Sequence, residues 1–114
     1  MTVASTLQNF CQSLQAAVAL HLPQATLTVE QKRGIVLNGR IELNEEMFIA
    51  VYFNALTGKT SYALIQQGRR LAGYDNYQFW HYHPLEEIER HQPCVEPTPE
   101  EASANLVGVM RQLP

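Results

Sequence analysis

Residues 47–53 read M-F-I-A-V-Y-F, a run in which every side chain is apolar or aromatic. In an extended chain successive side chains point to opposite faces, so this run is apolar on both faces. A strand of that kind usually lies inside a sheet, with helices on one face and a loop or partner on the other. We therefore predict an interior strand at residues 47–53, with Ile49 and Val51 buried in the core.

Shorter alternating runs flank this strand on both sides. Apolar and polar side chains alternate over residues 25–30 and 35–43, and residues 60–66 place Tyr62 and Leu64 on one face and Ala63 and Ile65 on the other. A further strand begins at Arg69, and another short extended run leads into Pro84. Short turns rich in Asn, Glu, Gln and Gly separate the longer runs. Because a parallel pairing needs a crossover of about a dozen residues or more, these turns predict an antiparallel meander. We expect four to six strands.

Amphipathic helices are predicted at both ends of the strand region. Residues 2–21 place apolar side chains at three- and four-residue steps, and Pro23 ends the pattern because proline disfavours helical geometry in the residue before it. Near the other end, Thr98 is a good N-cap, Pro99 suits the first helical position and Glu101 completes a capping box. The predicted fold class is therefore α+β: an antiparallel β-meander with the N- and C-terminal helices packed on one face.

Composition and charge restrict the class of protein. The chain fits one domain over residues 1–114, and its hydrophobic fraction of 46% argues against intrinsic disorder. The net charge of −3 and the sequence pI of about 5.7 offer no broad basic surface, so any contact with RNA has to be local. Cys11 and Cys94 are expected to be free thiols, and no segment resembles a signal peptide or a membrane span. We expect a soluble, cytoplasmic protein with no membrane partner.

One face of the predicted sheet is left without a cover. The two helices occupy a single face, whereas Phe48, Tyr52 and their neighbours lie on the other face. Exposed apolar patches of that kind usually mark an interface between proteins. A homodimer is therefore expected.

Residues 73–84, G-Y-D-N-Y-Q-F-W-H-Y-H-P, concentrate the groups that bind, titrate or stack. They hold the only Asp and the only Trp of the chain, with three of its five Tyr and two of its four His. In an extended run His81 and His83 share one face, and prolines in the polar loop 84–97 turn the chain so that His91 returns toward that face. The predicted catalytic or binding site brings together Tyr74, Asp75, Asn76, His81, His83 and His91, with Arg69 and Arg70 as a phosphate- or anion-binding pair.

The motifs of this stretch resemble those of a known family. Residues 74–76 read Y-D-N, residues 81–84 read H-Y-H-P, His91 follows, and residues 97–101 read P-T-P-E-E at the predicted helix start. Together they resemble the small TumE-like proteins of bacterial and archaeal toxin–antitoxin pairs, in which strands lead to an Asp-Asn motif, a His- and Pro-rich loop and an acidic helix. The resemblance covers residues 29–110. It implies a toxin-type protein with RNA-cleaving activity and an antitoxin protein as its partner.

The residues by themselves leave more than one chemistry open, and the first is metal binding. His81 and His83 on one strand face would ligate one ion, with His91, Cys94 or a loop glutamate as the third ligand. The sequence does not name the metal or any other cofactor.

Two further interpretations involve no metal. In one, the paired histidines act as general base and general acid in RNA cleavage, Tyr74 orients the substrate, and Arg69 or Arg70 steadies the phosphate. In the other, the stretch is structural: Asp75 and Asn76 form a turn, Trp80 and Tyr82 pack a face or an interface, and the histidines hydrogen-bond to Asp75 and to carbonyls of the long loop. The open function classes are thus a ribonuclease of toxin type and a non-catalytic module that binds a protein partner or a metal.

Overall fold

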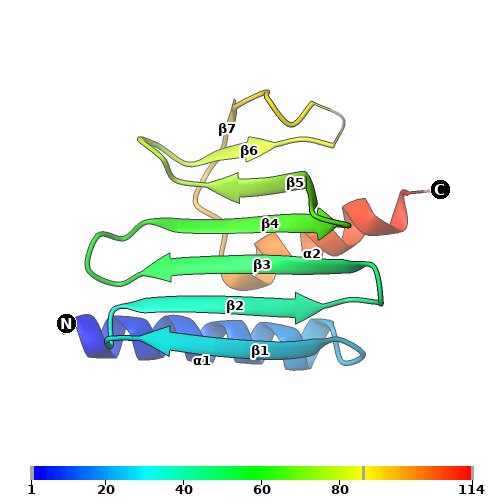
Figure 1. The fold of residues 1–114 in the computed structure, drawn as a ribbon. Helices are drawn as coiled ribbons and strands as arrows, with labels where there is room; N and C mark the ends of the chain where they lie inside the picture. The colour runs from blue at the N-terminus through cyan, green and yellow to red at the C-terminus, as the bar shows by residue number, and fades with distance from the viewer. Residues whose placement is uncertain (1, 86, 114) are drawn as a thin grey trace.

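One antiparallel sheet connects the two helices of the chain in the computed structural model, which describes residues 2–85 and 87–113 (Figure 1). In this part of the chain the sheet has seven strands, and each strand pairs with its neighbour in sequence. The elements are α1 (Val3–His21), β1 (Thr26–Lys32), β2 (Val36–Glu42), β3 (Met47–Asn54), β4 (Thr60–Gln66), β5 (Arg69–Asp75), β6 (His81–His83), β7 (Gln92–Pro93) and α2 (Pro99–Arg111). The predicted antiparallel meander and the α+β fold class are confirmed.

The described sheet has one strand more than the four to six that we expected. The additional strand is β7, which lies in the stretch 84–97 that reads as a polar loop. It forms because His81 pairs with Pro93 and Tyr82 with Gln92, which extends the sheet beyond β6. A strand of two residues is too short to show alternation, so no sequence pattern predicts it.

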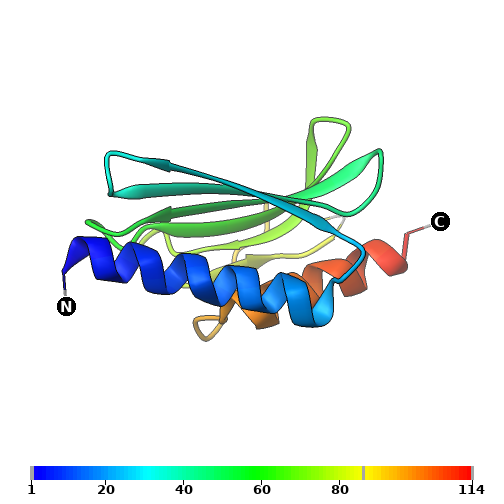
Figure 2. The same ribbon diagram turned by 90° about the horizontal axis from the view of Figure 1, so that it is seen from below.

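Both helices pack on the same face of the sheet, as predicted (Figure 2). α1 begins at the N-cap Thr2, which forms a capping box with Ser5, and α2 begins at Thr98, which forms one with Glu101. These side chains satisfy backbone N–H groups that have no partner inside the helix. Among the described residues no helix is long and apolar enough to cross a membrane.

The core lies between the helices and the sheet. The fully buried side chains come from both helices and from the middle strands, and they include Leu14, Leu37, Ile41, Ile49, Leu64 and Leu106. The rings of Phe10 and Phe53 stack with their centroids 4.2 Å apart and link α1 to β3. β3 lies between β2 and β4, as its apolar run predicts, and Ile49 and Val51 are 0% and 2% exposed.

The opposite face of the sheet is free of helices within the described chain (Figure 2). Phe48, Ala50 and Tyr52 of β3 are half-buried there, and the guanidinium of Arg40 lies 3.7 Å from the centroid of the Phe48 ring. This face continues across β4 and β5 toward β6. We call it the open face.

A charge placed in the core tests the position of β3. We predict that Ile49→Asp or Val51→Asp lowers the free energy of unfolding by more than about 3 kcal/mol, because a buried unpaired carboxylate has no compensating partner. Thr57→Asp, in the exposed turn between β3 and β4, is the control and should have little effect, because its carboxylate stays in solvent. Urea denaturation measures the differences. An Ile49→Asp protein as stable as the Thr57→Asp protein would contradict the placement of β3.

Candidate metal centre

The pairing of β5 with β6 places an aspartate and two histidines on one face. Asp75 pairs with His81, and Gly73, two residues before Asp75, pairs with His83. Side chains alternate along each strand, so Asp75, His81 and His83 point to the same side of the sheet. Tyr74 points to the other side, where its hydroxyl accepts a hydrogen bond of 2.8 Å from the Asn105 amide of α2. The cluster therefore lies on the open face, and the predicted sharing of one face by the two histidines is confirmed.

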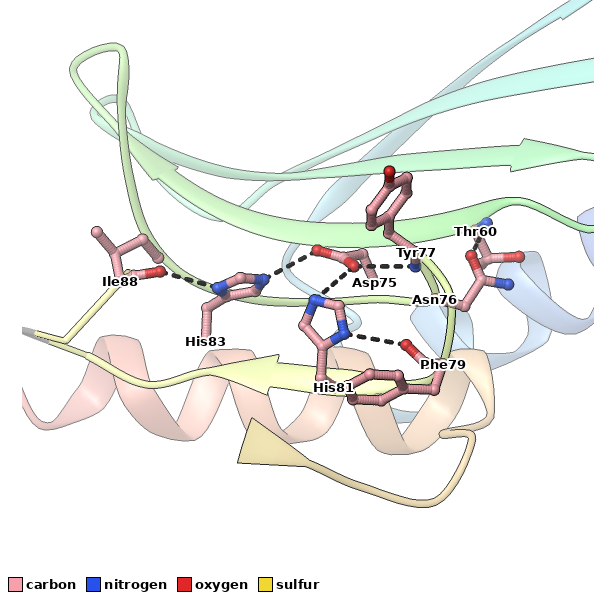
Figure 3. Close-up of polar contacts among 8 residues, drawn as sticks. All are labelled: Thr60, Asp75, Asn76, Tyr77, Phe79, His81, His83 and Ile88. Atoms are coloured by element: carbon pink, nitrogen blue, oxygen red, sulfur yellow. Dashed lines mark hydrogen bonds and ion pairs between the residues drawn. The ribbon is translucent and has the colours of Figure 1, made fainter. Parts of the chain in front are cut away.

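The Asp75 carboxylate bridges the two buried imidazoles (Figure 3). Its Oδ1 lies 2.8 Å from Nε2 of His81, and its Oδ2 lies 2.9 Å from Nε2 of His83. His81 and His83 are only 3% and 2% exposed, although a polar ring is costly to bury unless its nitrogens are satisfied. One carboxylate with two oxygens thus positions two rings at once.

The second nitrogen of each ring faces a backbone carbonyl (Figure 3). Nδ1 of His81 lies 3.0 Å from the oxygen of Phe79, and Nδ1 of His83 lies 2.8 Å from the oxygen of Ile88. A carbonyl oxygen only accepts hydrogen bonds, so we assign a proton to Nδ1 in both rings. Nε2 of each ring then contacts Asp75 as the donor of a second hydrogen bond, and it can act as a ligand atom only once that proton is displaced.

His91 completes a group of three rings. It directly precedes β7, whose pairing with β6 brings the returning loop beside the buried pair. The centroid of the His91 ring lies 4.7 Å from that of His81 and 4.6 Å from that of His83, and the two buried rings are 4.9 Å apart. One ring nitrogen from each histidine falls within 4.8 Å of the others. His91 is exposed, so the cluster meets solvent on its side.

The charge of Asp75 is held in place by its surroundings. Burial raises the pKa of Asp75, but the backbone N–H of Tyr77 and the imidazoles of His83 and His81 lower it by more. The pKa of Asp75 therefore lies below its ordinary value of 3.8, and the group is a carboxylate at neutral pH. The N–H of Tyr77 lies 3.2 Å from Oδ1, which also fixes the start of the loop between β5 and β6.

Asn76 has a structural role beside the cluster. Its side-chain oxygen accepts a hydrogen bond of 2.8 Å from the backbone N–H of Thr60, and its side-chain nitrogen donates one of 2.8 Å to the carbonyl of Gly58. These bonds fasten the end of β5 to the turn before β4. Asn76 thereby fixes the backbone next to Asp75. Both polar atoms of its side-chain amide are engaged in these backbone bonds.

Three other residues of the predicted site are not brought to the histidines. Tyr74 lies on the helix side, where its ring contacts that of Tyr82 and burial raises the pKa of its hydroxyl. Arg69 and Arg70 open β5 beside the turn at residues 67–68, five and six positions before Asp75. At about 3.3 Å per residue that separation is about 16–20 Å, which is too far for a shared small site.

Cys94 is also directed away from the histidines. It follows Pro93, the partner of His81, so alternation turns its side chain toward the helix side. Its backbone N–H donates to the carbonyl of Trp80 across β6. Burial and the charge of Asp75 raise the pKa of its thiol, which disfavours the thiolate that binds metals. Cys94 and Cys11 are both free thiols, as predicted.

Comparison of the chain with protein-family models, with curated proteins and with solved structures finds no match.

The lowered pKa of Asp75 gives a pH-dependent prediction. The stability that it contributes is present above the unfolded value of 3.8 and is lost as the pH falls through the lower folded value. We expect Asp75→Asn to lower the free energy of unfolding by about 1.5–3 kcal/mol at neutral pH, as for hydrogen bonds to a charged group. Urea denaturation from about pH 6 to about pH 3 should show this difference shrinking with acidity.

Glu45→Gln, in the exposed turn between β2 and β3, is the matched control for removal of a carboxylate. Its stability should follow that of the parent protein at every pH. A difference between Asp75→Asn and parent that stayed constant from neutral to acidic pH would contradict the assigned charge of Asp75.

Proposed function

We propose that this protein binds a divalent transition-metal ion of the zinc class through His81, His83 and His91, with the Asp75 carboxylate beside the ion. The observation that carries the proposal is the orientation of the two buried rings. Each uses Nδ1 to donate to a backbone carbonyl, so the other nitrogen, Nε2, which contacts Asp75, is the one that could ligate an ion. Histidines that ligate metals almost always donate their other ring N–H to such an acceptor.

A cation would replace the protons that link the two Nε2 atoms to Asp75. With those protons displaced, both nitrogens offer lone pairs and the Asp75 carboxylate offers only acceptor oxygens. Nε2 of His81 lies 2.8 Å from one oxygen of Asp75, and Nε2 of His83 lies 2.9 Å from the other. Both rings are almost fully buried at this place. A metal ion between them would satisfy all of these acceptors at once.

The ligand set favours zinc and related ions over magnesium or calcium. Imidazole nitrogens suit Zn²⁺, Cu²⁺, Ni²⁺ and Fe²⁺, whereas Mg²⁺ and Ca²⁺ prefer oxygen ligands. Two nitrogens that each lie about 2.1 Å from one ion are at most about 4.2 Å apart. The three ring nitrogens already lie within 4.8 Å, so a small movement of the exposed His91 side chain would close the site.

Zinc binding can be measured by calorimetry on the metal-free protein. We expect one Zn²⁺ per chain, and we expect His91→Ala to weaken binding at least tenfold, or about 1.4 kcal/mol, because it removes a ligand. His91 is exposed, so this variant should keep its fold, which circular dichroism would check. His81→Ala and His83→Ala should weaken binding further.

The remaining histidine provides the control. His21 ends α1 and pairs with Glu100, away from the cluster. His21→Ala should bind Zn²⁺ as the parent protein does. Equal affinity of the His91→Ala and His21→Ala proteins, or no binding by the parent, would refute the proposed metal function.

A second proposal follows from the resemblance to TumE-like proteins: a cytoplasmic toxin-type protein that cleaves RNA and is neutralised by an antitoxin protein. The exposure of His91 favours it, because the cluster can be reached from solvent there. Imidazole side chains are common general acids and bases in catalysis. Arg69 and Arg70 lie too far along β5 to hold the phosphate at this cluster.

Growth on induced expression tests this second proposal. We expect the parent protein and His21→Ala to arrest growth and His91→Ala to permit it at equal protein level. Purified parent protein should also cleave single-stranded RNA. Normal growth with the parent, or arrest with His91→Ala, would contradict a toxin function at this cluster.

A further inference from the structure

The two edges of the sheet differ in their capacity to pair. β7 forms one edge, contains only two residues and ends in Pro93, which has no backbone N–H to donate. β1 forms the other edge, contains seven residues and pairs with β2 in an unbroken register. Within the described chain β1 has no second neighbour, so one side of its backbone is left without strand partners. Figure 2 views the molecule from this side, with β1 in front and α1 packed below the sheet.

The first half of β1 lacks the features that usually protect an edge strand. The strand contains no proline and no bulge, and it is not short. Its two charged residues, Glu30 and Lys32, lie at one end and pair with each other, with Nζ and Oε1 3.5 Å apart. The half of the strand that precedes Glu30 reads T-L-T-V and carries no charge.

We propose that two copies of this chain associate by antiparallel pairing of their β1 strands about a two-fold axis at Thr28. In this register Thr28 faces Thr28 of the second copy, and Leu27 faces Val29 on both sides of the axis. Leu27 and Val29 are half-buried in the single chain and pack against the core, so the pairing would cover what remains exposed of both side chains. Thr26 faces Glu30, and no two like charges lie opposite each other.

Other registers along β1 fit less well. An axis at Glu30 sets two carboxylates against each other, which is destabilising. An axis at Gln31 leaves only the last residues of the strand to pair. An axis at Val29 separates Leu27 from apolar partners, because Leu27 then faces Gln31. An axis at Leu27 pairs Leu27 with itself but pairs Val29 with Ala25, which lies outside β1. The axis at Thr28 is therefore the one that pairs both apolar side chains with each other inside the strand.

The asymmetry of the edges also limits the size of the assembly. Because β7 is not able to extend the sheet, a second copy has only one edge through which to pair. Pairing of the same edge in both copies is isologous and closes as a dimer, whereas pairing of two different edges would produce an open fibre. The expected homodimer thus acquires a definite surface, which is distinct from the open face and from the histidine cluster.

Light scattering and engineered disulfides test the dimer and its register. We expect about twice the chain mass of 12.9 kDa at tens of micromolar protein. Both cysteine variants are made in a Cys94→Ser background, with the buried Cys11 retained. Thr28→Cys should form a covalent dimer on mild oxidation, because its sulfur faces its own copy across the axis.

Thr26→Cys is the matched control, since Thr26 is an exposed threonine of the same strand face. In the proposed register the two copies of residue 26 lie four positions apart, or about 13 Å, which exceeds the reach of a disulfide. Thr28→Lys should give the monomer mass, because two ammonium groups would then face each other. A monomeric parent, equal cross-linking at 26 and 28, or a dimer that Thr28→Cys fails to cross-link would each overturn the proposal.

Discussion

The bridge from one carboxylate to two imidazoles is the interaction on which the rest of the site depends. Asp75 contacts Nε2 of His81 through one oxygen and Nε2 of His83 through the other, at 2.8 and 2.9 Å. Each ring is held from its opposite side by a backbone carbonyl, so neither ring can rotate without losing a hydrogen bond. A group with one oxygen would hold one ring only. The arrangement that makes the cluster suitable for a metal is thus set by the only aspartate of the chain.

The sheet supports this bridge by bringing distant residues together on the face without helices. β5 is fixed by its pairing with β4 and by the amide of Asn76, which bonds to the turn before β4. Gly73 allows this close approach, because a Cβ at that position would lie 2.5 Å from the carbonyl oxygen of Tyr62. β6 then aligns on β5, and β7 returns His91 to the pair. Two polar rings can be buried here because every ring nitrogen of the pair has a partner.

Much of this arrangement follows from the sequence, since it rests on local patterns. The apolar run of β3 indicates an interior strand, and the capping box of Thr98 and Glu101 predicts the start of α2. Alternation places His81 and His83 on one face. The structural interpretation predicts ring contacts with Asp75 and with carbonyls of the loop at 84–97, but the sequence does not single out Ile88 or Phe79, because every residue has a carbonyl. β5 is a single strand that ends at Asp75. Alternation along it places Tyr74 on the opposite face from the histidines, and the length of the strand places Arg69 and Arg70 far from them.

The most direct test of the metal centre is X-ray absorption spectroscopy of the zinc-loaded protein. We expect a first shell of nitrogen and oxygen only, with the outer-shell scattering of three imidazole rings. That result would follow from His81, His83 and His91 as ligands with Asp75 or water beside them. A sulfur scatterer at about 2.3 Å would assign a cysteine to the ion instead. A sulfur signal, or a shell without imidazole scattering, would rule out a metal centre built from the three histidines.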